Sequence, residues 1–166
     1  MALIPIIGFA HPHTLSSQRA NLVIAKDEIT VHLIIKPSPA EGARLLASID
    51  TNNNQRWEEE ETAAAASQFT AAIQLKLNGS RSTLPLKWHS IEVKHFDHLA
   101  AGHGEITLEY KANSPLTAGR IELSISDQWV AAPWFIQPWL ADDMTANRFP
   151  KVIRAETPNA YLALEF

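Results

Sequence analysis

Apolar and polar positions alternate in short runs along most of the chain. The clearest run is 28–36, in which every second residue from Ile29 to Ile35 is aliphatic. An alternation with period two indicates a strand that buries one of its faces. Comparable runs, separated by Gly, Pro, Asn and Ser, lie at 18–25, 73–77, 83–88, 90–96, 104–111, 120–126, 134–140, 152–155 and 160–166. This spacing of short strands is typical of a β-sandwich.

Two segments near the middle of the chain have helical rather than strand periodicity. A short helix is expected over Glu41–Ile49, and a longer one from about Trp57 to Ala72, with Phe69 on its apolar stripe. Four consecutive glutamates at 58–61 favour the positive end of a helix. The sequence therefore predicts an α+β, mainly β domain. We expect an antiparallel, immunoglobulin-like β-sandwich with one helix–loop–helix insertion at about 40–73.

Composition narrows the possible functions. The chain has 166 residues, 46% hydrophobic and 19% charged, which is typical of one globular domain. A net charge of -4 argues against binding to nucleic acid. Because there is no Cys, disulfides, thiolate zinc sites and cysteine nucleophiles are excluded, whereas seven His remain. No apolar run is long enough to predict a membrane span.

The first residues have the character of an export signal. Residues 2–10, ALIPIIGFA, are apolar and contain the small residues Gly8 and Ala10, and no charge occurs before Arg19. This pattern resembles the end of a signal peptide cleaved before His11, and the alternative is that the segment is a first strand. We therefore expect residues 1–10 to be a signal remnant, residues 11–166 to be the mature domain, and the protein to be periplasmic.

The strongest candidate site is the segment from Asp50 to Glu61. A calcium loop of the EF-hand type places oxygen ligands at positions 1, 3, 5, 7, 9 and 12, the seventh being a main-chain carbonyl. These positions are filled here by Asp50, Asn52, Asn54, the carbonyl of Arg56, Glu58 and Glu61. Predicted helices flank the segment on both sides. The pattern predicts a weak calcium site.

Two features depart from a strong calcium loop. Position six requires a positive φ and is usually glycine, whereas Gln55 stands there at a cost of about 1 kcal/mol. Asn52 and Asn54 also replace the usual aspartates and lower the charge of the site. The alternative is a polar loop in which Asn54 caps a helix with an acidic first turn.

The histidines form two candidate groups for Zn²⁺, Ni²⁺ or Cu²⁺. His11 would become the amino terminus after cleavage, and its amine and imidazole, with His13, could bind copper. Pro12 blocks the square-planar site with four nitrogen ligands because it has no N–H to ionise. The second group consists of His89, His95, Asp97, His98 and His103. If this region is a strand, His95 and Asp97 share a face.

Aromatic residues and prolines concentrate near the C-terminus, in Trp134-Phe135, Pro138-Trp139 and Phe149-Pro150. They could form a stacking platform for a sugar or a peptide. The interpretation that we prefer is a core with edge strands that proline protects from aggregation.

Several of these features together resemble a known group of proteins. AHPHT at 10–14, the strand pair, LLASID before the EF-like loop, the Ala-rich helix and the Asn78-Gly79 turn are similar to small exported bacterial proteins. These are periplasmic components found with nickel/cobalt- or zinc-type transporters, and the extracytoplasmic domain of HupE/UreJ-type proteins. The likeness covers about residues 10–110. It implies an auxiliary role in metal-ion handling at the cell envelope.

Three functions follow as hypotheses. The first is a non-enzymatic periplasmic accessory or binding protein for divalent-metal homeostasis or transport, with a membrane transporter or another envelope protein as partner. The second is a copper-dependent enzyme that uses a mature N-terminal His11. The third is a structural or interaction module of the cell envelope.

Overall fold

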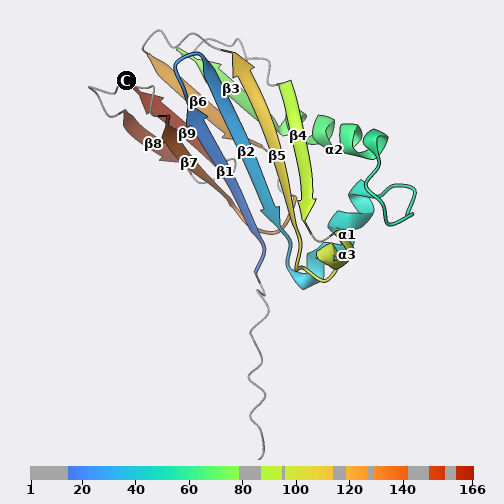
Figure 1. Cartoon of the computed structure of the whole chain (residues 1–166). Helices are drawn as coiled ribbons and strands as arrows, with labels where there is room; N and C mark the ends of the chain where they lie inside the picture. Colours follow the sequence, from blue (N-terminus) through green and yellow to red (C-terminus); the bar gives the residue numbers. More distant parts are fainter. Residues whose placement is uncertain are drawn as a thin grey trace, which may run out of the picture.

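The computed structural model of the chain describes residues 15–78, 87–94, 96–113, 119–126, 129–141, 150–155 and 160–166. In these parts, two β-sheets face one another, and three helices lie together along one side of them (Figure 1). The chain is therefore mainly β with a helical segment inserted, as the sequence predicts. No helix within the described residues is long and apolar enough to cross a membrane.

Most elements follow the predicted runs, but the described parts of the runs 83–88 and 90–96 form one strand over residues 87–94, and residues 96–99 are helical. The strands are β1 (Ser17–Ile24), β2 (Glu28–Lys36), β3 (Ile73–Leu77), β4 (Lys87–Lys94), β5 (Glu105–Asn113), β6 (Arg120–Ile125), β7 (Trp134–Leu140), β8 (Lys151–Ala155) and β9 (Ala160–Glu165). The helices are α1 (Pro39–Ile49), α2 (Glu59–Ala72) and α3 (Phe96–Leu99). One sheet has the order β4-β5-β2-β1-β7, and the other has the order β3-β6-β9-β8.

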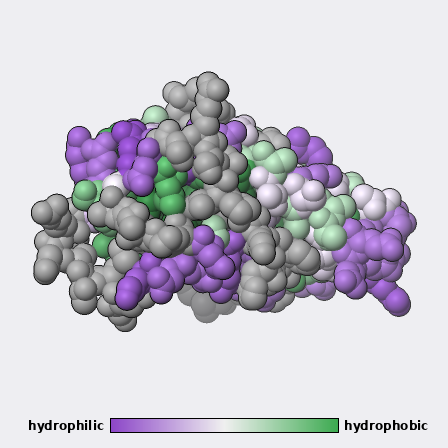
Figure 2. Space-filling view, turned by 90° about the horizontal axis from the view of Figure 1, so that it is seen from above, coloured by the Kyte–Doolittle hydropathy of each residue, from purple (hydrophilic) through white to green (hydrophobic). Residues whose placement is uncertain are grey.

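A single hydrophobic core joins the two sheets and the helices. Leu22 and Leu108 from one sheet, Leu123 and Leu162 from the other, and Phe69 of α2 belong to the same buried cluster. Seen from above, apolar residues lie between two hydrophilic bands (Figure 2). The alternating pattern of each strand thus places its apolar face toward the opposite sheet.

The expectation of a wholly antiparallel sandwich is wrong at one pair of strands. β1 and β7 run parallel, with Gln18 opposite Trp134. The buried side chain of Gln18 explains the direction of β7. Its Nε2 donates to the carbonyl of Ala132 at 2.5 Å, and its Oε1 accepts from the N–H of Trp129 at 2.9 Å. These bonds hold the segment before β7 at the beginning of β1, so β7 starts beside β1 and runs the same way.

The Asn78-Gly79 turn between the runs 73–77 and 83–88 also predicts that these two runs pair as a hairpin, and the described residues do not form it. β3 pairs with β6, with Ile73 opposite Ile125, whereas β4 belongs to the other sheet. Asn78 has the positive φ expected of a turn residue, 54°. Its main-chain N–H donates to the carbonyl of Arg120 at 2.6 Å, which fixes the end of β3 against β6. The local turn signal was therefore right, but the strand partner was wrong.

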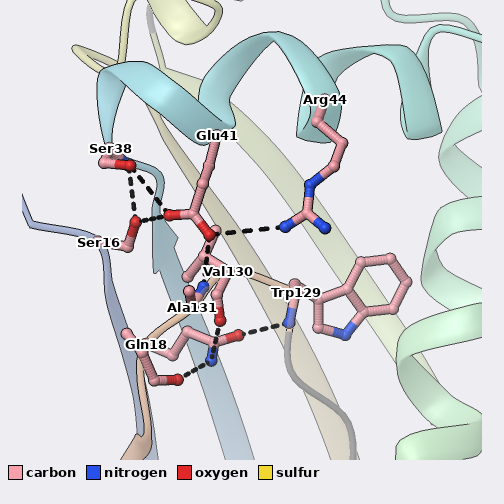
Figure 3. A network of polar contacts seen from close by, with 9 residues as sticks. Ser16, Gln18, Ser38, Glu41, Arg44, Trp129, Val130 and Ala131 are labelled. Carbon is pink, nitrogen blue, oxygen red and sulfur yellow. Dashed lines mark hydrogen bonds and ion pairs between the residues drawn. The ribbon is translucent and has the colours of Figure 1, made fainter.

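The carboxylate of Glu41 joins three segments at the beginning of α1 (Figure 3). It accepts hydrogen bonds from the hydroxyls of Ser16 and Ser38 and from the N–H of Ala131. Arg44 lies 3.5 Å from the same carboxylate. Since α1 ends where the candidate loop starts, this network fixes the helix that leads into the loop.

We expect Glu41→Gln to lower the free energy of unfolding at pH 7 by about 1–3 kcal/mol. The hydrogen bond from Ser16 lowers the pKa of Glu41; burial raises it, and the N–H of Ala131 lowers it further, so that the net shift is downward. The stabilisation by ionised Glu41 is complete above the unfolded pKa of about 4.3, and is lost as the pH falls through the lower folded value. Urea unfolding at pH 7 and pH 3 should show that the difference in free energy of unfolding between wild type and variant shrinks at pH 3. An equal difference at both pH values would contradict a stabilising role for the ionised carboxylate of Glu41.

Candidate functional site

The loop between α1 and α2 has two residues in the left-handed backbone region. Asn53 has φ 57° and Gln55 has φ 59°. These are positions four and six of the EF-like pattern, counted from Asp50. The positive φ that the sequence analysis required at position six is thus present, although glutamine rather than glycine adopts it. The loop lies at the end of the helical side of the molecule, where the surface is hydrophilic (Figures 1 and 2).

The carboxylate of Asp50 is the centre around which the loop folds. Asp50 is buried, with 4% of its surface exposed. Its Oδ1 accepts from the N–H of Asn54 at 3.0 Å, and its Oδ2 accepts from the N–H of Gln55 at 2.9 Å. Ionised carboxylates form strong hydrogen bonds with main-chain N–H groups. Asp50 therefore holds the tight turn that brings the later loop residues back toward α1.

The polar side chains at positions three, five and nine lie together. Nδ2 of Asn52 donates to Oε2 of Glu58 at 2.8 Å, and Nδ2 of Asn54 donates to Oε1 of the same residue at 2.8 Å. The Oδ1 atoms of the two asparagines accept main-chain N–H groups of the loop. A half-turn of either amide about χ2 exchanges its nitrogen and oxygen, so these groups can present oxygen to a cation.

Glu61 occupies position twelve and is the most unusual group in the loop. It is 6% exposed. Its Oε1 accepts from the hydroxyl of Thr51 and from the N–H of Asn52, both at 3.2 Å. Its Oε2 is buried and has no hydrogen-bond partner among the described residues. A buried carboxylate oxygen without a hydrogen bond is costly, and the Nε1 of Trp57 in the same loop is likewise buried without a partner among the described residues.

The pKa of Glu61 remains below its ordinary value. Burial raises the pKa, but hydrogen bonds from the N–H of Asn52 and the hydroxyl of Thr51 lower it more. Glu61 is therefore a carboxylate at neutral pH, which is the form that calcium requires.

The remaining loop positions connect the site to the rest of the fold. Arg56 is exposed, and its N–H donates to Oδ1 of Asn54 at 2.8 Å, so the ligand expected from it is the main-chain carbonyl. The ring of Trp57 packs edge-on against Phe96, with centroids 6.0 Å apart. This contact joins the loop to α3, and it places a fluorescent side chain beside the candidate ligands.

The structure brings together only part of the predicted histidine cluster. His11, His13 and His95 lie outside the described residues, and the side chain of His89 is not described. Asp97 does not continue a strand with His95, because residues 96–99 form α3. Packing of Phe96 against Trp57 accompanies this helical turn. His98 Nε2 lies 3.3 Å from Oδ2 of Asp97, and both side chains are largely exposed.

The main-chain N–H of His103 donates to the carbonyl of His98 at 3.2 Å, and His103 lines a surface cleft with Lys36, Lys94 and Glu105. In the part of the chain that the structure describes, no group of three or more His, Asp or Glu side chains is arranged to hold a metal ion. The carboxylates of Asp50, Glu58 and Glu61 are thus not gathered as one group in the described part of the chain. The side chains that do meet in the loop are the amides of Asn52 and Asn54, which both contact Glu58.

Two residues that position the loop, Thr51 and Glu41, are not among those predicted from the sequence. Thr51 orients Glu61 through its hydroxyl. Glu41 anchors α1, and the order Ser38-Pro39-Ala40-Glu41 has the spacing of a helix capping box, which could have revealed it. In the structure, the Ser38 hydroxyl donates to Glu41 at 3.0 Å, whereas the Ser38 N–H donates to Ser16.

Gln55→Gly should stabilise the protein by about 0.5–1 kcal/mol, because glycine adopts φ 59° without steric cost. Gln74 is a matched control, since it is exposed in β3 and has no positive φ; Gln74→Gly should destabilise by a similar amount. Urea unfolding of both variants measures the effects. Destabilisation by Gln55→Gly would show that the left-handed conformation at Gln55 is wrong.

Comparison with protein-family models gives no match to this chain, and a search of curated proteins gives none either. The loop residues and their contacts are thus the basis on which a function can be assigned.

Proposed function

We propose that this protein is a non-enzymatic binding module whose Asp50–Glu61 loop binds Ca²⁺. The observation that carries this proposal is the buried Oε2 of Glu61, which has no partner among the described residues. It stands at the position where EF-hand loops supply a bidentate glutamate. The positive φ of Gln55 and the two N–H bonds to Asp50 support the same loop geometry.

The donor set suits calcium better than the alternatives. Ca²⁺ takes six to eight oxygen ligands in flexible geometry, whereas Zn²⁺, Ni²⁺ and Cu²⁺ favour nitrogen or sulfur. The proposed ligands are the side chains of Asp50, Asn52, Asn54, Glu58 and Glu61 and the carbonyl of Arg56. Three carboxylates neutralise the ion but give less charge than tight sites have. We therefore expect a dissociation constant of about 10⁻⁴–10⁻³ M, which is the range of extracellular modules.

The proposal also includes the location of the protein in the cell and its role there. We infer a periplasmic accessory role in divalent-metal homeostasis, beside a membrane transporter or another envelope protein. The export-like residues 2–10 and the AHPHT segment support this setting. We also infer immunoglobulin-like topology for the sandwich, since two sheets share one core. Mass spectrometry of the native protein would test the cleavage before His11 that this setting requires.

Calorimetric titration of the full chain with Ca²⁺ tests the central proposal. We expect one site with millimolar to submillimolar affinity and a change in Trp57 fluorescence, because Trp57 lies within the loop. Mg²⁺ should bind more weakly, since it demands near-ideal octahedral geometry. If Ca²⁺ gives neither heat nor a fluorescence change, the proposal fails.

A further inference from the structure

Exposed apolar side chains gather on the side of the sandwich opposite the helices. Phe135 and Trp139 of β7 and Val152 of β8 are 51%, 52% and 45% exposed. β7 and β8 are edge strands of different sheets. Figure 1 shows them side by side, far from the loop between α1 and α2. The surface formed by β7 and β8, which we call the seam, is therefore independent of the proposed calcium site.

A pocket opens where β7 and β8 meet, between the beginning of β7, the end of β8 and the beginning of β9. It is lined by Trp134, Phe135, Ile136, Arg154 and Tyr161, together with Pro133, Ala155 and Ala160. Trp134 and Ile136 are buried and form an apolar floor. Phe135 and Arg154 stand at its rim, where solvent reaches both. A small apolar group could enter between them and displace water from this surface.

One arginine lies over the ring of Phe135, and another is its partner in the neighbouring strand. The guanidinium of Arg154 lies over the ring, 5.3 Å from its centroid. Arg19 is the residue of β1 directly opposite Phe135 in the parallel register, and partners in adjacent strands lie about 5 Å apart. Within the described residues, neither arginine forms an ion pair with a carboxylate, whereas Arg44 and Arg120 do. Among the described residues, no carboxylate compensates this positive charge beside the apolar pocket, in a chain whose net charge is -4.

From these observations we infer a binding site for a small organic carboxylate with an aromatic or alkyl body. The apolar body lies on Trp134 and Phe135, and the carboxylate lies at the rim. Arg154 is the main partner of the carboxylate, since guanidinium and carboxylate form paired charge-assisted hydrogen bonds. Arg19, the strand partner of Phe135, adds a second positive charge nearby.

Titration of the ¹⁵N-labelled full chain with 3-phenylpropionate, followed by NMR, tests this site. We expect a dissociation constant in the millimolar range, which is ordinary for so small a ligand. The shifts should concentrate at Phe135, Arg154 and Tyr161. The neutral alcohol 3-phenylpropan-1-ol should bind about tenfold more weakly, because it lacks the charged partner.

Arg154→Ala should weaken binding of the carboxylate about tenfold or more and leave the alcohol nearly unaffected. Lys76→Ala is the matched control, since it removes one positive charge from β3, the opposite edge of the same sheet as β8. It should not change the affinity. Equal affinity for acid and alcohol, unchanged binding by Arg154→Ala, or absence of saturable shifts would each overturn the inference. None of these outcomes depends on calcium, so the two proposals can fail separately.

Discussion

Glu61→Gln is expected to abolish detectable calcium binding. In the proposed site, Glu61 supplies a carboxylate whose buried Oε2 has no hydrogen-bond partner among the described residues. Its replacement would remove both a charge and the proposed bidentate ligand. Loss of a group that merely supports a metal ligand costs 10–100-fold in affinity, so loss of a ligand should cost about 100-fold or more. From a starting value of about 10⁻⁴–10⁻³ M, that change moves binding beyond the range of calorimetry.

Glu60→Gln is the control for this variant. It removes the same charge from the same turn of α2, but the Glu60 side chain is exposed and is not a proposed ligand. Calcium at ten times the dissociation constant should stabilise the wild type and Glu60→Gln by about 1.4 kcal/mol. Glu61→Gln should gain nothing. If Glu60→Gln lost binding as completely as Glu61→Gln, the loop would attract calcium only through its general negative charge.

The same loop shows how far the sequence could predict the site. Ligand spacing predicted that Asn52 and Asn54 lie beside Glu58, but the carboxylates of Asp50, Glu58 and Glu61 do not form one group in the described residues. The need for a positive φ at Gln55 followed from the position of glycine in such loops. The bonds from the asparagine amides to Glu58 could not be predicted, because they depend on side-chain rotation rather than on spacing. Burial of Glu61 could not be predicted either, since it results from packing of α2 on the core.

Strand positions were predictable because alternation is a local property, but strand partners were not. The parallel pairing of β1 with β7 depends on Gln18, whose amide holds residues 129–132 across more than a hundred residues of sequence. The short helix α3 depends similarly on a distant contact, that between Phe96 and Trp57. In both cases, tertiary contacts decided between local conformations that the sequence pattern left open.

The second large effect that we expect is destabilisation by Gly42→Ala, although alanine normally favours a helix. Gly42 lies in α1, where the carbonyl oxygens of Leu99 and Ala100 approach closely. A Cβ at this position would lie 2.2 Å from the first oxygen and 2.7 Å from the second. Both contacts are with backbone, so they cannot be relieved by rotating a side chain. The interface between α1 and α3 must open instead.

Whether Gly42→Ala stabilises or destabilises the protein depends on the gain in helix propensity and on the steric cost of the added carbon. Replacing glycine by alanine inside a helix gains about 1 kcal/mol, whereas forcing an extra carbon into a close-packed site costs typically 1–3 kcal/mol and sometimes more. With two backbone clashes, we expect a net loss of about 2 kcal/mol, or roughly 4–8 °C in Tm for a chain of this size. Ala43→Gly, at the exposed neighbouring position, measures the effect of helix propensity without a steric clash. It should lower the free energy of unfolding by about 1 kcal/mol. A Tm of Gly42→Ala equal to or above that of the wild type would show that α1 and α3 do not approach so closely.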